Sequence, residues 1–162
     1  MPSAVSTAPV VADASPLIAL DHLGHLDLLR ELFGTVLIPP AVAREASSLH
    51  TLPDFISVRA LGQPVAARVL AASLGPGERE AMSLAIETSA RWVILDDRPA
   101  RRLAEALGMP VIGTLGVLTT AKRRGLLAAV RPCLDSLNDA GFRISVPLYE
   151  RILAEAGETE DG

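Results

Sequence analysis

Short apolar segments alternate with helical patterns along the chain, and this alternation constrains the fold more than any other feature. Strands joined by helices form right-handed crossovers and a mainly parallel sheet. The sequence therefore predicts an α/β fold. The expected strands are residues 10–13 (VVAD), 35–40 (TVLIPP), 55–61 (FISVRAL), 92–95 (WVIL) and 109–113 (MPVIG).

The segments between these strands carry helix signals. Ser15 is a candidate N-cap with Pro16 in the first helical position, Pro40 opens a second helix, and Gly108 stands where a helix would end. Gly24 lies inside the first helical segment and is a point at which that helix can break. The expected helices are residues 15–34, 40–49, 63–73, 78–90, 98–108 and 114–125, with mostly helical structure from residue 126 onward.

Length and composition place the chain among single-domain globular proteins. Its 162 residues suffice for one core, and 49% of them are apolar and 21% charged. We expect a domain over residues 9–156, a flexible N-terminus at residues 1–8 and an acidic tail at residues 157–162. The single cysteine excludes an intrachain disulfide, and no segment has the pattern of a secretory signal or a membrane span. The cytoplasm is the expected location.

Charge is distributed unevenly along the sequence. The formal net charge is −4, but residues 91–131 carry eight Arg and Lys against three acids, a local charge of +5. Aromatic residues make up only 3% of the chain, which disfavours the stacking of bases on aromatic rings. A basic surface beside acidic groups is therefore the feature suited to a polyanion.

Acidic residues stand at the ends of two expected strands. Asp13 ends the first strand, and the pair Asp96 and Asp97 follows the fourth. If the sheet winds outward through strands two and three and returns to place strand four beside strand one, these ends become neighbours. Ligands of open α/β sheets bind at such a switch point, outside the carboxyl ends of the strands.

Three glutamates lie on helices beside this crevice: Glu45, Glu78 and Glu80. Several carboxylates in one crevice repel each other unless a cation compensates. Mg²⁺ or Mn²⁺ suits oxygen ligands, activates water and neutralises charge on a phosphodiester. A simpler explanation also exists, because the helix dipole favours acids in a first helical turn and Asp96 could cap the next helix.

Basic residues follow the paired aspartates directly. Arg98, Arg101 and Arg102 fall, with Glu105, on one face of the expected helix. They form either a solvated, partly paired face or a phosphate-binding face, since Arg binds phosphate through two parallel hydrogen bonds.

Other polar residues allow weaker predictions. Thr114 fits a helix cap, although its place after the fifth strand would also let it face the crevice. Ser15 is better explained as a cap than as a nucleophile. The histidines lie away from the strand ends and are interpreted as structural or surface residues: His22, His25 and His50.

Four motifs, in this order, resemble the PIN domain, the metal-dependent ribonuclease fold of VapC-like bacterial toxins. They are VVADASPLIAL, IPPAVAREA, LGPGEREAMSLA and VILDDRPARRLAEALGMPVIGTLGVLTTAKRRG, and the resemblance covers roughly residues 9–156. The Ser-Pro-Leu, Gly-Glu-x-Glu-Ala and Asp-Asp-Arg motifs are similar to a toxin-type subfamily. This resemblance implies a three-layer fold with a central five-stranded parallel sheet in the order 3-2-1-4-5, flanked by helices.

The same resemblance implies an activity and a set of site residues. The activity would be an Mg²⁺- or Mn²⁺-dependent endoribonuclease that cleaves single-stranded RNA, forms a homodimer and is neutralised by a small antitoxin. Carried over by position, Asp13, Glu45 and Asp97 are catalytic metal ligands, with Asp96 as an additional ligand. Glu80 stands where the family has an aspartate and is the remaining catalytic metal ligand, although Glu78 competes for that role. The candidate substrate-binding residues are Arg98, Arg101, Arg102, Ser15 and Thr114.

Two other function classes stay open. A degenerate PIN-like module would bind RNA or a protein partner without cutting, although the chain keeps acids at all four family positions. A receiver-type phosphate-transfer regulator also clusters acids at strand ends. That fold has an acid pair after the first strand and a single acid after the third, whereas here the pair follows the fourth and FISVRAL ends without an acid.

Overall fold

Five parallel strands form one sheet in the order β3-β2-β1-β4-β5, which confirms the predicted fold class and winding. The computed structural model describes residues 8–49 and 51–159, so the predictions for residues 1–7, His50 and residues 160–162 lie outside the described residues. The strands are β1 Val10–Ala12, β2 Val36–Ile38, β3 Ile56–Val58, β4 Trp92–Ile94 and β5 Val111–Ile112.

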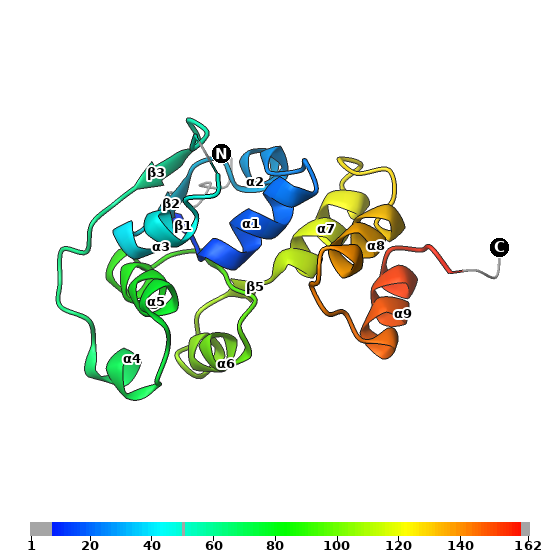
Figure 1. The fold of residues 1–162 in the computed structure, drawn as a ribbon. Helices are drawn as coiled ribbons and strands as arrows, with labels where there is room; N and C mark the ends of the chain where they lie inside the picture. The colour runs from blue at the N-terminus through cyan, green and yellow to red at the C-terminus, as the bar shows by residue number, and fades with distance from the viewer. Residues whose placement is uncertain (1–7, 50, 160–162) are drawn as a thin grey trace, which may run out of the picture.

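Helices cover both faces of this sheet. In Figure 1, α1, α2 and α7 lie on one side of the strands and α5 and α6 on the other, which gives the three layers of a doubly covered sheet. The helices are α1 Ala14–His22, α2 Asp27–Phe33, α3 Pro40–Glu45, α4 Ala67–Ala71, α5 Pro76–Thr88, α6 Arg98–Ala106, α7 Thr114–Arg123, α8 Arg131–Asp139 and α9 Val146–Glu155.

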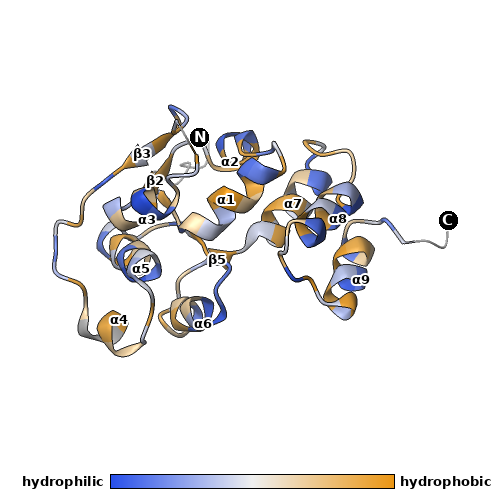
Figure 2. Cartoon of the chain, viewed as in Figure 1, coloured by the Kyte–Doolittle hydropathy of each residue, from blue (hydrophilic) through white to orange (hydrophobic). Residues whose placement is uncertain are grey.

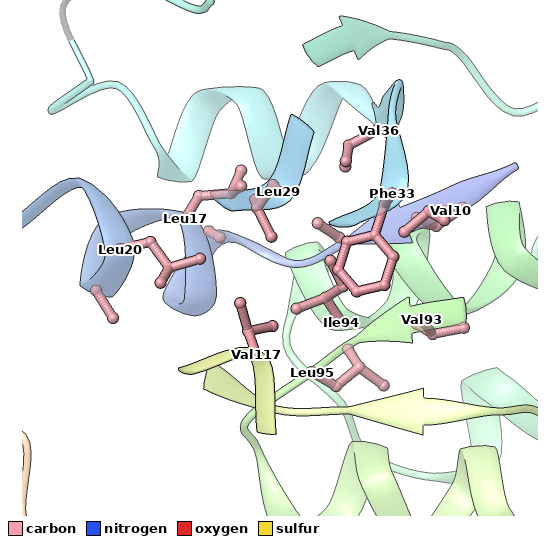
Figure 3. Packing of buried hydrophobic residues seen from close by; sticks show 14 of the residues in the cluster. Val10, Leu17, Leu20, Leu29, Phe33, Val36, Val93, Ile94, Leu95 and Val117 are labelled. Carbon is pink, nitrogen blue, oxygen red and sulfur yellow. The ribbon is translucent and has the colours of Figure 1, made fainter. Parts of the chain in front are cut away.

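The central strands β1 and β4 carry the core and fix the position of the site. Val10, Val11 and Ala12 are all buried because helices cover both faces, and they pair in parallel with Trp92, Val93 and Ile94. Figure 3 shows leucines of α1 and α2 packed around these strands, with Val117 of α7 among them. The carboxyl ends of β1 and β4 therefore lie side by side in the buried core.

The first predicted helix is two helices. Gly24 has a φ of 72°, in the left-handed region that glycine adopts without strain, and the helical conformation is interrupted there, between α1 and α2. The N-cap prediction for Ser15 was wrong: α1 begins at Ala14, and Asp13 occupies the N-cap position. The helix predicted over residues 63–73 shortens to α4, Ala67–Ala71.

The last described residues pack against the domain. The Glu158 carboxylate accepts hydrogen bonds from the backbone N–H groups of Val130 (2.7 Å) and Arg131 (3.2 Å) and from the Lys122 ammonium (3.1 Å). Glu158, in the expected acidic tail, therefore caps the start of α8 with its side chain.

Helix α6 shows how the surface elements are built. Its buried residues, Ala100 and Ala104, are four positions apart and lie on one face, while Arg98 and Arg102 are exposed. Figure 2 shows this division as hydrophobic and hydrophilic stretches of the same helix. Within residues 8–49 and 51–159, no helix combines the length and apolar character needed to cross a membrane.

Candidate functional site

Asp13 is a buried carboxyl group at the end of the central strand. Its backbone N–H donates to the carbonyl oxygen of Ile94 (3.0 Å), which fixes the end of β1 against β4. Only 2% of the residue is exposed, and its side chain makes no capping hydrogen bond to α1. Among the described residues, its Oδ1 atom is buried without a hydrogen-bond partner. Burying an acceptor in this way is unfavourable unless another group satisfies it.

The surroundings of Asp13 raise the pKa of its carboxyl group. The pKa of Asp13 is raised from 3.8 to about 7, mainly by burial and in smaller part by the charges of Glu78, Glu45 and Asp96, against the lowering effect of the Ala14 backbone N–H. These three acids come from α5, α3 and the segment after β4. Four separate parts of the chain therefore bring carboxylates near enough for their charges to act on Asp13.

Glu45 reaches the cluster from the end of α3. Its Oε1 atom accepts a hydrogen bond from the backbone N–H of Gly77 (2.9 Å), in the first turn of α5. A Cβ atom at position 77 would overlap the Glu45 carboxylate, so only glycine allows this approach. The positive end of the α5 dipole also favours a carboxylate there.

The two glutamates in the first turns of α5 have different environments. The charge of Glu78 acts on Asp13. Glu80 instead accepts a hydrogen bond from the Ala41 backbone N–H (3.2 Å), and its Oε2 atom lies 3.9 Å from Nη2 of Arg44. Glu80 thus links α5 to the start of α3, and Glu78 is the member of the pair that belongs to the acidic cluster.

The two aspartates after β4 also separate. Asp96 accepts two hydrogen bonds from Thr114, one from the backbone N–H (2.7 Å) and one from the hydroxyl group (2.6 Å), and its charge acts on Asp13. Asp97 is exposed and caps α6 by accepting a hydrogen bond from the Ala100 backbone N–H (3.1 Å). Of the two, Asp96 is the one whose charge acts on Asp13.

Thr114 holds Asp96 in position. It is 4% exposed and is the first residue of α7, after Gly113 at the N-cap position. The hydroxyl therefore orients a carboxylate of the cluster rather than capping its own helix. A Cβ atom at Gly113 would overlap the Arg101 guanidinium and lie 2.9 Å from Oδ1 of Asp96, so this glycine lets both side chains approach.

The predicted substrate-binding residues lie at different depths around the cluster. Arg101 is partly buried and donates a hydrogen bond from Nη1 to the Leu95 carbonyl oxygen (3.2 Å). Arg98 and Arg102 are exposed on α6. Ser15 is exposed in the first turn of α1, two residues after Asp13. Arg101 is thus the arginine that the fold itself fixes beside the acids.

Comparison with known proteins identifies the family. The family model DUF3368, described as a PIN domain, matches residues 9–158, which is nearly the whole chain. The chain belongs to the PIN-domain family. A search of curated proteins found no match. PIN domains are generally nucleases and usually use divalent metal ions.

The acids of this PIN domain fit a hydrated divalent cation better than a closely chelated one. Among the described residues, no three His, Cys, Asp or Glu side chains converge into a ready-made metal site. Glu45 and Asp96 are already bound to backbone N–H groups, whereas Oδ1 of Asp13 is buried and unsatisfied. Mg²⁺ commonly keeps several waters and takes only one or two carboxylates directly. Asp13 would be such a direct ligand.

Sequence reasoning missed the glycines of the PIN-domain site. Gly77 and Gly113 bear no chemistry, yet each makes room for a carboxylate of the cluster. The available signal is position: both stand at the start of a helix, next to a predicted functional residue. A glycine within a helix, as at position 77 of α5, is otherwise unfavourable, because it loses more conformational freedom on folding than other residues.

Proposed function

We propose that this PIN domain is an Mg²⁺- or Mn²⁺-dependent endoribonuclease that cleaves single-stranded RNA and acts as the toxin of a toxin–antitoxin pair. One observation carries the nuclease proposal: a buried, unsatisfied carboxyl group, Asp13, is surrounded by the charges of three other acids at the carboxyl ends of β1 and β4. Such an arrangement is stable near neutral pH only with a proton or a cation.

The proposed ligand set differs from the sequence prediction at two positions. Asp13 and Asp96 would hold the ion from the strand ends, and Glu45 and Glu78 would act from the helices, directly or through water. Glu80 and Asp97 leave the set because neither is among the acids whose charges act on Asp13, and each has a contact elsewhere, Glu80 with α3 and Asp97 with α6.

Residues of the chain would prepare the reaction around this ion. When bound, the ion would supply Lewis-acid chemistry that activates water and offsets charge on the phosphodiester. Thr114 and the Gly77 backbone N–H orient Asp96 and Glu45 before substrate arrives. Arg101, fixed beside Asp96 and already hydrogen-bonded to the Leu95 carbonyl oxygen, could offer its remaining N–H groups to a phosphate.

The decisive experiment is cleavage of labelled single-stranded RNA with Mn²⁺, Mg²⁺ or EDTA. We expect cleavage only with a divalent ion, and a loss on the order of 100-fold or more in Asp13→Asn and Asp96→Asn, since each removes a ligand charge. Asp97→Asn is the matched control, because Asn caps helices as well as Asp does and the neighbouring position leaves the cluster intact. Cleavage that persists in EDTA and in both cluster variants would refute the proposal.

The toxin role has its own test. It is supported by the resemblance of the Ser-Pro-Leu, Gly-Glu-x-Glu-Ala and Asp-Asp-Arg motifs to toxin-type PIN domains. Expression of the chain in a bacterial host should arrest growth, and expression of Asp96→Asn should not. Normal growth during expression of a verified active nuclease would exclude the toxin role. A homodimer, or a complex with the proposed antitoxin, would be detected by its larger molecular mass.

One observation favours a second candidate, a module that binds RNA or protein without cutting. Glu45 and Asp96 both accept backbone hydrogen bonds, which a metal would have to share or displace. This module would bind the same RNA with Mn²⁺ present and leave it intact, so the cleavage assay separates the two candidates.

A further inference from the structure

A cleft adjoins the acidic cluster on the side of β5. Its volume is about 490 Å³, and its walls come from α6, β5, α7 and α9. Figure 1 shows α6 and α9 on either side of the junction between β5 and α7. Asp96 belongs both to the wall of this cleft and to the acidic cluster, so the two sites are continuous. The volume is within the range of roughly 300–1,000 Å³ typical of small-molecule sites.

Three arginines from two distant parts of the sequence line this cleft. Arg98 and Arg101 come from α6, and Arg151 comes from α9. The Arg151 side chain is 67% exposed, and its Nε atom lies 3.8 Å from Oε1 of Glu155, one helical turn away. An exposed pair at that distance is weak, so Arg151 can turn to a stronger anionic ligand at little cost. Guanidinium groups are suited to bind phosphate oxygens in pairs.

The same cleft also has an apolar lining. Leu115 of α7 and Leu148 of α9 are partly buried in its wall, and Ile152 is buried beside them. A phosphate alone does not require apolar side chains, whereas a nucleotide brings both a phosphate and the flat face of a base. Because none of the described residues that line the site is aromatic, the base would contact aliphatic side chains and arginine planes.

We propose that this cleft holds one nucleotide of the RNA strand beside the phosphodiester bond that lies at the acidic cluster. Arg98 and Arg151 bind its phosphate, and Leu115, Leu148 and Ile152 contact its base. The C-terminal helix α9 is then a substrate-binding element. This inference rests on the proposed function in taking RNA as the substrate.

The test measures RNA binding without cleavage. A short fluorescent single-stranded RNA is titrated with the full chain in EDTA, and the affinity is followed by anisotropy at several salt concentrations. We expect Arg151→Gln and Arg98→Gln each to weaken binding about 5- to 10-fold and to reduce the salt slope by about 0.7, the value for one phosphate contact on a single strand. Arg143→Gln is the matched control, because Arg143 is exposed, lies outside the lining of the cleft and should keep wild-type affinity.

A second variant tests the contact with the base. Leu148→Ala should weaken RNA binding several-fold and leave binding of inorganic polyphosphate unchanged. Equal effects on both probes, or none on either, would overturn the assignment of a base to this cleft. Wild-type RNA affinity in Arg151→Gln and Arg98→Gln would overturn the whole inference and leave the cleft to a protein partner.

Failure of this inference is distinguishable from failure of the proposed nuclease. Binding is measured without metal, so it can persist in a chain that does not cut, and cleavage can persist when Arg151 has no effect. Thermal melts of all variants check that the fold is intact.

Discussion

At the scale of single residues, the site depends on a carboxyl group that the fold buries at a free-energy cost. Asp13 is held near a pKa of about 7 by burial and by three neighbouring acids. In the unfolded chain the same group ionises near its ordinary value of 3.8. Between these values the folded state binds the proton and the unfolded state does not, so folding and proton binding are linked.

The sign of this linkage gives the first prediction. Stability without metal should fall as the pH rises from about 4 to about 7, by up to about 4 kcal/mol at 1.36 kcal/mol for each unit of pKa shift. Asp13→Asn removes the titrating group, so this variant should lose much of the pH dependence and be more stable than wild type at pH 8. Urea unfolding in EDTA at pH 5 and pH 8 measures both effects. Identical pH slopes for the two proteins would contradict the linkage.

Gly77 gives a second prediction at this scale. Gly77→Ala should reduce cleavage by about 10- to 100-fold, as changes to residues that orient metal ligands commonly do, because the new methyl group displaces the Glu45 carboxylate. Helix propensity alone would favour Ala in α5 by about 0.8–1.0 kcal/mol, so a melt can show an intact fold while activity falls.

The matched control is a double-mutant cycle with Glu45→Gln. If Gly77 acts through Glu45, Gly77→Ala should cost much less activity in the Glu45→Gln background. Additive losses in the double variant would show that Gly77 acts in some other way.

At the scale of secondary-structure elements, two helix N-termini receive carboxylates from elsewhere in the chain. Glu45 of α3 binds the first turn of α5, and Asp96 after β4 binds the first residue of α7. Each contact satisfies a backbone N–H that has no partner within its own helix. The helix starts therefore hold two of the four acids in place.

The third prediction concerns the hydroxyl of Thr114. Thr114→Val keeps the shape of the side chain but removes a hydrogen bond to Asp96, and we expect cleavage to fall about 10-fold or more. Thr120→Val is the matched control, because this threonine of the same helix lies outside the lining of the cleft and its hydroxyl accepts a hydrogen bond only from Nη2 of Arg123 (3.3 Å) among the contacts described. Equal losses in both variants would point to general destabilisation of α7.

The sequence alone predicts that acidic residues meet at the strand ends, but it does not decide which of two nearby acids faces Asp13. The order of the strands follows from the alternation of elements and from the family resemblance, and it places Asp13 beside the residues after β4. Whether Asp96 or Asp97 faces Asp13 depends on the direction of the backbone two or three residues beyond the three-residue strand β4. Whether Glu78 or Glu80 does so depends on how α5 is rotated against α3. Neither the backbone direction after β4 nor the rotation of α5 can be predicted from composition or from the spacing of residues.

At the scale of the whole molecule, Glu158 joins the last described residues to α7 and α8. Burial raises its pKa, but the N–H groups of Val130 and Arg131 and the charge of Lys122 lower it more, so the net shift is downward and the group stays charged. Its contacts hold α9, which carries Arg151, against the rest of the domain. Composition could not predict these contacts, because an acidic segment at the end of a sequence is expected to be solvated unless its partners are known.

The fourth prediction follows from these contacts. Glu158→Gln should lower the free energy of unfolding by about 1–3 kcal/mol, since hydrogen bonds to a charged group are replaced by weaker ones. Glu150→Gln, at an exposed position of α9, should change it by less than about 0.5 kcal/mol. Chemical denaturation compares the two, and equal stabilities would show that Glu158 does not secure the end of the domain.

The buried Asp13 carboxyl has a consequence beyond catalysis. On the proposed function, a divalent ion binds the folded chain and not the unfolded one, so the ion shifts the folding equilibrium by mass action. When the ion is scarce, a larger fraction of the protein would be unfolded and open to proteases, and the nuclease would also be inactive. The catalytic rate and the lifetime of the protein would therefore depend on the same ion. Limited trypsin digestion with and without Mn²⁺ would measure the effect on lifetime.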